Sequence, residues 1–303
     1  GKVPSLNGDS GAATDVEKSI LNRVIGEKNF EDAEAIVRQR VAARPNDLAE
    51  RVSLAQILIW QKKLDEAEAV LRQAVADDPA DPDRRVLLVE FLVASGKIEP
   101  AEQAAAQVER AVGPDRAPQA MASCSALIAQ GAQAAGRDAL KTKWIASAKE
   151  WHRRAQAAKP ADFSRRRAYV EFLLRMSLVD DVEAELTSIL KPADASRAVD
   201  PADLAWARRT LALTYVARAD LTGDYQQALK ALYLYAPPDK ADEKLPEEAE
   251  DLRVLARVYA AQRIVSYRTK AAAILKKLVD ERRASEDDRY LLARIYKADG
   301  DWD

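Results

Sequence analysis

Few residues in this sequence are of types that could carry out acid–base, nucleophilic or metal chemistry. His152 is the only histidine and Cys124 is the only cysteine. A serine or cysteine nucleophile needs a base beside it, and a zinc site built on histidines needs more than one of them. Cys124 also lies among apolar neighbours such as Met121 and Leu127, which is typical of a small buried side chain. We therefore expect neither residue to be catalytic.

The motifs of common enzyme classes are absent from the sequence. It contains no Gly-x-x-x-x-Gly-Lys-Ser/Thr loop and no strand-linked Gly-x-Gly-x-x-Gly turn, which would hold a nucleotide phosphate. The acidic pairs Asp77-Asp78, Asp180-Asp181 and Glu247-Glu248 fall at expected turns and helix starts. Carboxylates near helix N-termini interact favourably with the helix dipole, so these pairs need no catalytic role. We predict that the protein is not an enzyme, with no cofactor and no bound metal.

The composition favours helices and argues against two classes of binding protein. Apolar residues make up 48% of the 303 residues but aromatic residues only 6%, and strand-forming residues are scarce. Charged residues make up 32%, yet the net charge is −2, which argues against a general nucleic-acid or membrane binder. No apolar run approaches the ~18 residues of a membrane span. A lone cysteine suits the cytoplasm or a disulfide-free periplasmic protein, and we expect the cytoplasm first.

A fixed 34-residue period organises the N-terminal part of the chain. FEDAEAIVRQRVAARP, at residues 30–45, resembles LDEAEAVLRQAVADDP at residues 64–79. Each segment is predicted to form an amphipathic helix that ends at a proline. A constant period of this length is typical of stacked helical repeats. On this period His152 occupies the position of Leu71, so we expect it to be packed.

The period divides the chain into three regions. Residues 1–13 are polar and lack periodicity, which predicts a flexible leader. Residues 14–115 read as three regular repeats, with a small residue at each helix crossing. Residues 116–303 keep the phase but are looser, with inserted loops and an incomplete last repeat.

These residues resemble the tetratricopeptide repeat family, here as a bacterial-type array. The second repeat carries the family pattern except at its leading tryptophan, where Arg51 stands; the matching residues are Leu54, Ala55, Leu58, Ala67, Leu71, Ala74 and Pro79. The resemblance implies an all-α superhelical solenoid of about seven helix pairs plus a truncated eighth. We expect the chain to be a piece of a longer protein, and the cut repeat could support self-association.

In this family the first helix of each pair lines a concave groove that binds a peptide or a partner helix. The resemblance therefore implies a non-catalytic protein-interaction scaffold. Its C-terminal groove is expected to be basic, so the peptide or protein partner could be acidic. RNA binding is the alternative, which would need a basic groove throughout. Trp60 could anchor a partner or cap the core. The expected groove residues are Lys18, Asn22, Gln56, Trp60, Glu90, Arg167, Glu171, Arg175, Arg253, Arg257, Tyr290, Arg294 and Lys297.

A five-residue carboxylate clamp for acidic chaperone tails occurs in some proteins of this family. Lys18 and Asn22 match its first two members, but Ser53, Asp83 and Leu87 occupy the other places. Asp83 would repel a carboxylate, so we do not expect this clamp.

Overall fold

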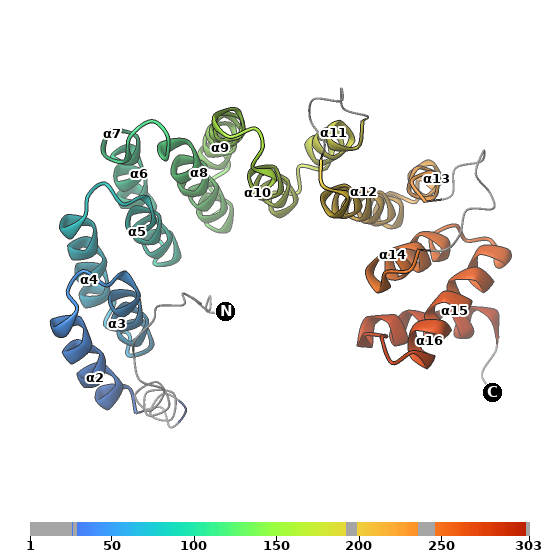
Figure 1. The fold of residues 1–303 in the computed structure, drawn as a ribbon, viewed down its shortest axis with the longest axis horizontal. Coiled ribbons are helices and arrows are strands. Elements are labelled where there is room, and N and C mark those ends of the chain that lie inside the picture. The colour runs from blue at the N-terminus through green and yellow to red at the C-terminus, as the bar shows by residue number, and fades with distance from the viewer. Residues whose placement is uncertain (1–25, 27–28, 192–198, 236–245, 301–303) are drawn as a thin grey trace. The chain divides into compact units, whose positions relative to one another are not determined.

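The structure is a computed structural model that describes residues 26, 29–191, 199–235 and 246–300. Every regular element in these ranges is a helix, and consecutive helices pair in antiparallel fashion (Figure 1). The expected all-α fold of stacked helix pairs is thereby confirmed. Lys18, Asn22, the leader and most of the expected inserted loops lie outside the described residues.

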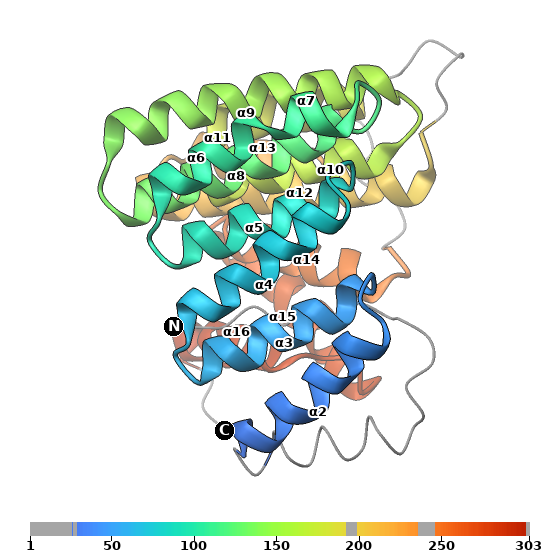
Figure 2. The same cartoon turned by 90° about the vertical axis from the view of Figure 1, so that its left-hand side faces the viewer.

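The chain forms two compact units, Gly1–Tyr169 and Val170–Asp303, with the boundary inside α10 (Phe163–Arg175). In unit 1 the helices stack in chain order, as Figure 2 shows from the side. First helices alternate with second helices, which lie on the other side of the stack (Figure 1). The helices are α2 (Phe30–Ala43), α3 (Leu48–Trp60), α4 (Leu64–Asp77), α5 (Pro82–Ala94), α6 (Ile98–Ala106), α7 (Val108–Val112), α8 (Ala117–Ala134) and α9 (Asp138–Ala158).

Unit 2 continues the same alternation. Here α12 and α14 are first helices that contact each other, and α13 and α15 are the second helices that follow them. The helices are α11 (Val179–Leu190), α12 (Pro201–Thr222), α13 (Tyr225–Tyr233), α14 (Ala249–Ala260), α15 (Val265–Asp280) and α16 (Glu286–Asp299).

The helix crossings are built around small residues. Ala33, Ala67 and Ala101 are fully buried, as the 34-residue period predicts. Large side chains such as Leu71 fill the space one turn further along. Because a methyl group is all that fits between two close backbones, the crossing position must stay small.

Each first helix of unit 1 passes into its second helix through one residue in the left-handed conformation. Gly96 has φ +73°, and Lys62, one period earlier, has φ +63°. The N–H of the next residue then bonds back into the helix, as Lys97 N does to the Leu92 carbonyl oxygen at 2.8 Å. This hydrogen bond is the Schellman closure of a helix C-terminus.

The extra length of the fourth repeat lies in its helices. Residues 138–158 form the continuous helix α9, which follows the 18-residue helix α8. Gly131 lets α8 approach α5 closely, because a Cβ there would lie 2.6 Å from Val93 Cγ1. By contrast, the second helix of the third repeat is interrupted at Gln107, between α6 and α7.

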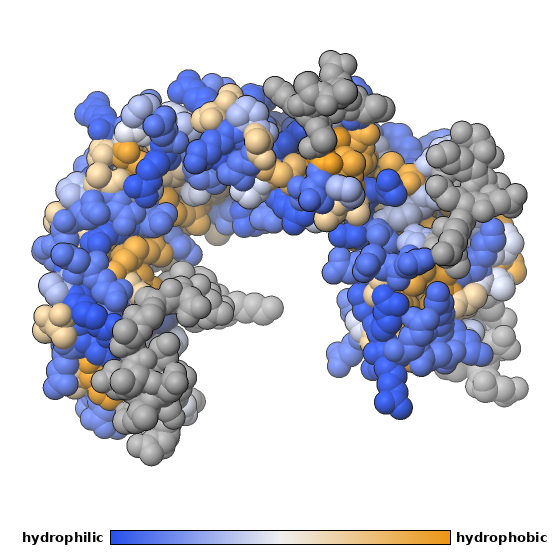
Figure 3. Space-filling model, viewed as in Figure 1, coloured by the Kyte–Doolittle hydropathy of each residue, from blue (hydrophilic) through white to orange (hydrophobic). Residues whose placement is uncertain are grey.

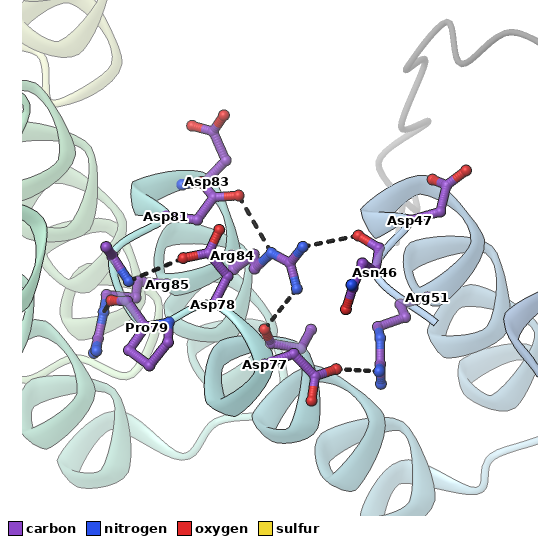
Figure 4. Close-up of polar contacts among 12 residues, drawn as sticks. Asn46, Asp47, Arg51, Asp77, Asp78, Pro79, Asp81, Asp83, Arg84 and Arg85 are labelled. Atoms are coloured by element: carbon purple, nitrogen blue, oxygen red, sulfur yellow. Dashed lines mark hydrogen bonds and ion pairs between the residues drawn. The ribbon is translucent and has the colours of Figure 1, made fainter. Parts of the chain in front are cut away.

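Arginines near the starts of the first helices join one repeat to the next (Figure 4). Arg84 donates from Nη1 to the Ala74 carbonyl oxygen at 2.9 Å and from Nη2 to the Asn46 carbonyl oxygen at 2.8 Å. Arg165 makes the equivalent bond to the Ala155 carbonyl oxygen at 2.6 Å. These bonds bring a side-chain donor to carbonyl groups near the C-terminal ends of the preceding helices and, at Asn46, to the loop between α2 and α3.

Arg51 and Arg85 form a second set, one residue later in their repeats. Their Nε atoms donate to the carbonyl oxygens of Pro45, at 2.9 Å, and Pro79, at 2.7 Å. Arg51 also forms an ion pair with Asp77. Arg51 thus has a structural role at the position where the family pattern carries tryptophan.

Glu50 occupies in the second repeat the position that Arg84 has in the third. It is 1% exposed and accepts a hydrogen bond from Arg40 Nη2 at 2.8 Å. Arg44 forms a second ion pair with the same carboxylate. The contact between repeats is kept at this position, but its charges are reversed.

The crossing alanines give a direct test of the packing. We expect Ala67→Leu to lower the free energy of unfolding by about 1–3 kcal/mol, because the added carbons overpack the crossing. Urea denaturation of the two proteins would measure the difference. Ala69→Leu on the exposed side of the same helix is the matched control and should have little effect. Equal losses from the two variants would contradict the assigned crossing.

Candidate partner-binding surface

The expected groove residues that the structure describes all lie on first helices. They are Gln56 and Trp60 on α3, Glu90 on α5, Arg167, Glu171 and Arg175 on α10, Arg253 and Arg257 on α14, and Tyr290, Arg294 and Lys297 on α16.

In unit 1 one face of α3 and one face of α5 carry half-exposed, mainly apolar side chains. We call this face the Glu90 surface. Positions three and four apart share one side of a helix, and α3 and α5 lie on the same side of the stack (Figure 1). Figure 3 shows hydrophobic atoms on this part of unit 1 between hydrophilic ones. The Glu90 surface consists of Val52, Gln56 and Ile59 on α3 and Val86, Glu90 and Val93 on α5.

The Glu90 carboxylate is the charged group of this surface. It is partly buried on the helix face that it shares with Val86 and Val93, and in the described part of the chain no side chain forms an ion pair or a hydrogen bond with it. Burial raises the pKa of Glu90 above its usual value of 4.5. A charge that is partly removed from water without a counter-charge costs free energy, which a cation from outside could offset.

Gln56 stands at the same repeat position on α3, 34 residues before Glu90. Its Nε2 is buried and has no hydrogen-bond partner among the described residues. An unsatisfied buried donor costs about 1–3 kcal/mol. Two adjacent repeats thus present, at the same position, a polar group whose bonding capacity is unused.

Trp60 is half-buried at the end of α3. Its ring packs on Phe30 with 5.6 Å between the ring centroids, and the neighbouring Gln61 donates to the Phe30 carbonyl oxygen at 2.7 Å. Both contacts join the end of α3 to the start of α2.

In unit 2 the two arginines of α14 face carboxylates of α16. Arg253 Nε donates to Asp288 Oδ2 at 2.8 Å, and Arg253 also donates to the Arg283 carbonyl oxygen. Arg257 Nη2 lies 3.6 Å from Asp287 Oδ2. Burial alone would raise the pKa of Asp288, but hydrogen bonds from Ser285 and Arg253 hold it below its usual value. These charges are largely balanced inside the unit.

Among the remaining cations expected on first helices, Arg167 is half-buried and Arg294 is exposed. The Arg167 guanidinium lies over the Phe163 ring, 5.7 Å from its centroid, and the Arg294 guanidinium lies 6.0 Å from the Tyr290 ring centroid. Arg175, Glu171 and Lys297 are exposed. Such contacts leave a guanidinium partly available to a ligand.

The two candidate chemical residues are packed inside unit 1. Burial raises the pKa of the Cys124 thiol to about 12, which makes the thiolate scarce at neutral pH. His152 is 4% exposed, and its ring lies 5.2 Å from that of Tyr169. The described residues contain no cluster of three or more His, Cys, Asp or Glu side chains that could hold a metal ion. Among the described helices, none has both the length and the apolar character needed to cross a membrane.

A sequence model of the tetratricopeptide repeat (TPR) family matches residues 24–83 and 61–130. These residues form TPR repeats. The match covers α2 to α7 and most of α8, including the whole Glu90 surface.

Several solved structures resemble the chain at low identity. A TPR protein from Parabacteroides merdae is 14% identical, with 93% of this chain and 98% of that chain covered and a TM-score of 0.38. PilF of Pseudomonas aeruginosa is 14% identical, with 75% and 94% covered and a TM-score of 0.39. PilW, a type IV pilus biogenesis factor, is 16% identical, with 92% and 100% covered and a TM-score of 0.34. These likenesses are too low to transfer a function. No curated protein sequence matches the chain significantly.

The partly buried environment of Glu90 predicts a pH-dependent stability. Since its pKa is raised in the folded state, stability is full below the unfolded value of 4.5 and falls as the pH rises through the folded value. Glu90→Gln avoids this loss. We therefore expect the free energy of unfolding of Glu90→Gln, relative to that of the wild type, to increase as the pH is raised from 3 to 7. Urea denaturation at each pH would measure this difference.

Glu99→Gln is the matched control on α6. A backbone N–H and Arg137 lower the pKa of Glu99, so this substitution should change relative stability with pH in the opposite direction. The same pH trend for both variants would contradict the raised pKa of Glu90.

Proposed function

We propose that this chain is a non-catalytic protein-interaction scaffold that binds a peptide segment or a partner helix on its first helices. TPR repeats in general support such a role. The proposal rests above all on the partly buried Glu90 carboxylate, which shares its helix face with valines and pairs with no cation among the residues that the structure describes. A scaffold that used this face only for packing would have no reason to keep an ionised group there.

The Glu90 surface favours a partner that combines apolar side chains with one lysine or arginine. Val52, Ile59 and Val86 offer apolar contacts, and a cation from the partner would pair with Glu90 in a partly desolvated site. Gln56 could donate its unused Nε2 hydrogen to a backbone carbonyl of the partner. An extended peptide supplies such carbonyls along its length, and a helix supplies them at its C-terminus.

For unit 2 we propose a weaker, more exposed contact with acidic groups. Arg175 and Arg294 are its candidates because both are exposed, whereas Arg253 and Arg257 face Asp288 and Asp287. An acidic partner would have to compete with these carboxylates before it could use the arginines of α14.

The RNA-binding alternative has less support. Readout of single-stranded RNA would need cations and stacking platforms along the first helices. The Glu90 surface instead presents a carboxylate that would repel phosphate. No described contact favours RNA over a protein partner.

A displayed library of random peptides would test the binding proposal. We expect selection on the full chain to enrich peptides with a lysine or arginine flanked by apolar residues. Glu90→Arg should weaken the enriched peptides by at least roughly tenfold, since an attractive contact becomes repulsive. Calorimetric titration of synthetic peptides would measure this.

Glu99→Arg is the control for this experiment. It makes the same charge change on an exposed position of α6, away from the Glu90 surface, and should leave the affinity within about twofold. Enriched peptides without basic residues, or an equal effect of both substitutions, would refute the proposed site.

A further inference from the structure

A small polar cavity lies between α4, α5 and α6 in unit 1. It has a volume of about 140 Å³, whereas one water molecule needs about 10–15 Å³. Its polar lining comes from two arginines and two glutamines, Arg72, Arg85, Gln103 and Gln107. No carboxylate lines it. The cavity can therefore hold more than a single water, and its walls are rich in hydrogen-bond donors.

Arg85 is the central group of this cavity. It is 8% exposed, and its Nε donates to the Pro79 carbonyl oxygen at 2.7 Å. Among the residues described, its two terminal nitrogens have no hydrogen-bond acceptor and no carboxylate partner. Burial lowers the pKa of Arg85, and the nearby Cys124 thiol, with its pKa of about 12, is neutral. The Arg85 guanidinium is largely shielded from water and has no counter-charge among the described residues, so an anion is favoured at its terminal nitrogens.

The preceding repeat shows what is missing. Arg51 lies 34 residues before Arg85 and makes the same bond to the proline carbonyl, but it is also paired with Asp77. One period after Asp77 the sequence has Ala111. The interruption of the second helix at Gln107 lies just before this position. The third repeat has therefore kept the arginine and lost its internal carboxylate.

The free donors suit a small oxyanion. The Nη atoms of Arg85 form a planar fork that can bind two oxygens of one anion at once. Gln103 and Gln107 can add amide hydrogens from the opposite wall. Arg72 adds positive charge at the exposed rim, where its Nε is already bound to Glu68 at 2.8 Å. A chloride ion could balance the charge of Arg85, but a single atom cannot offer two separate acceptors to its two Nη donors.

We propose that this cavity is a binding site for a compact oxyanion, a phosphate or a carboxylate, held by the guanidinium of Arg85. The site lies on another side of α5 from the Glu90 surface, so it does not depend on the proposed partner binding. The oxyanion could be a free ion or a side-chain group of a partner.

Calorimetric titration of the full chain with inorganic phosphate, at constant ionic strength set with chloride, would test the proposal. We expect saturable binding to the wild type. Arg85→Met should weaken it at least roughly tenfold, or about 1.4 kcal/mol. Arg38→Gln is the matched control, because Arg38 is the exposed counterpart of Arg72 one period earlier; it should bind phosphate like the wild type.

A second variant tests the proposal independently of whether Arg85→Met folds. Gln107 is exposed, so Gln107→Glu should fold normally while its carboxylate competes for Arg85 and abolishes phosphate binding. A parallel titration with acetate separates the two sources: tighter phosphate binding assigns the site to a tetrahedral anion, and equal or tighter acetate binding assigns it to a carboxylate side chain. Absence of saturable binding by both anions, or unchanged phosphate binding by Gln107→Glu, would overturn the proposal.

Discussion

The close crossing of the two helices in each pair is the constraint on which this structure depends. Ala33, Ala67 and Ala101 are fully buried because nothing larger fits between the backbones. The crossing fixes how far apart the helices lie, and therefore which side chains reach the next repeat. One face of each pair remains apolar after the crossing forms, and the neighbouring repeat covers it. The Glu90 surface is what this stacking leaves uncovered on the first helices.

The repeat period made the backbone fold predictable. The alternation of small and large apolar residues is local and recurs every 34 residues, so Ala67 and Leu71 could be placed from sequence alone. The ion pairs between helices could not be predicted from the sequence alone. Arg253 and Asp288 are 35 residues apart and meet only because α14 and α16 stack side by side. Choosing among many possible partners needs the positions of both helices and the side-chain rotamers, which no local pattern contains.

The arginine contacts between repeats carried a weak signal that sequence reasoning missed. Arg51 and Arg85 are one period apart, and Arg51 replaces the tryptophan of the family pattern. A charged residue repeated at an otherwise apolar position indicates a fixed partner, here a proline carbonyl in both cases. The interruption at Gln107 carried no signal, because no glycine or proline marks it in the sequence.

The reversed contact at Glu50 and Arg84 makes the repeats of unit 1 distinguishable from one another. Glu50 accepts from Arg40 at the end of α2, whereas Arg84 donates to the Ala74 and Asn46 carbonyl oxygens. If the second and third repeats were exchanged, a carboxylate would face carbonyl oxygens and an arginine would face arginines. Such a contact sets the order of the repeats by electrostatics, although the helix crossings are alike. Arg84 also joins three successive repeats, because its own repeat, that of Ala74 and that of Asn46 meet at one side chain. This contact couples the folding of the three repeats more tightly than contacts between adjacent pairs alone would do.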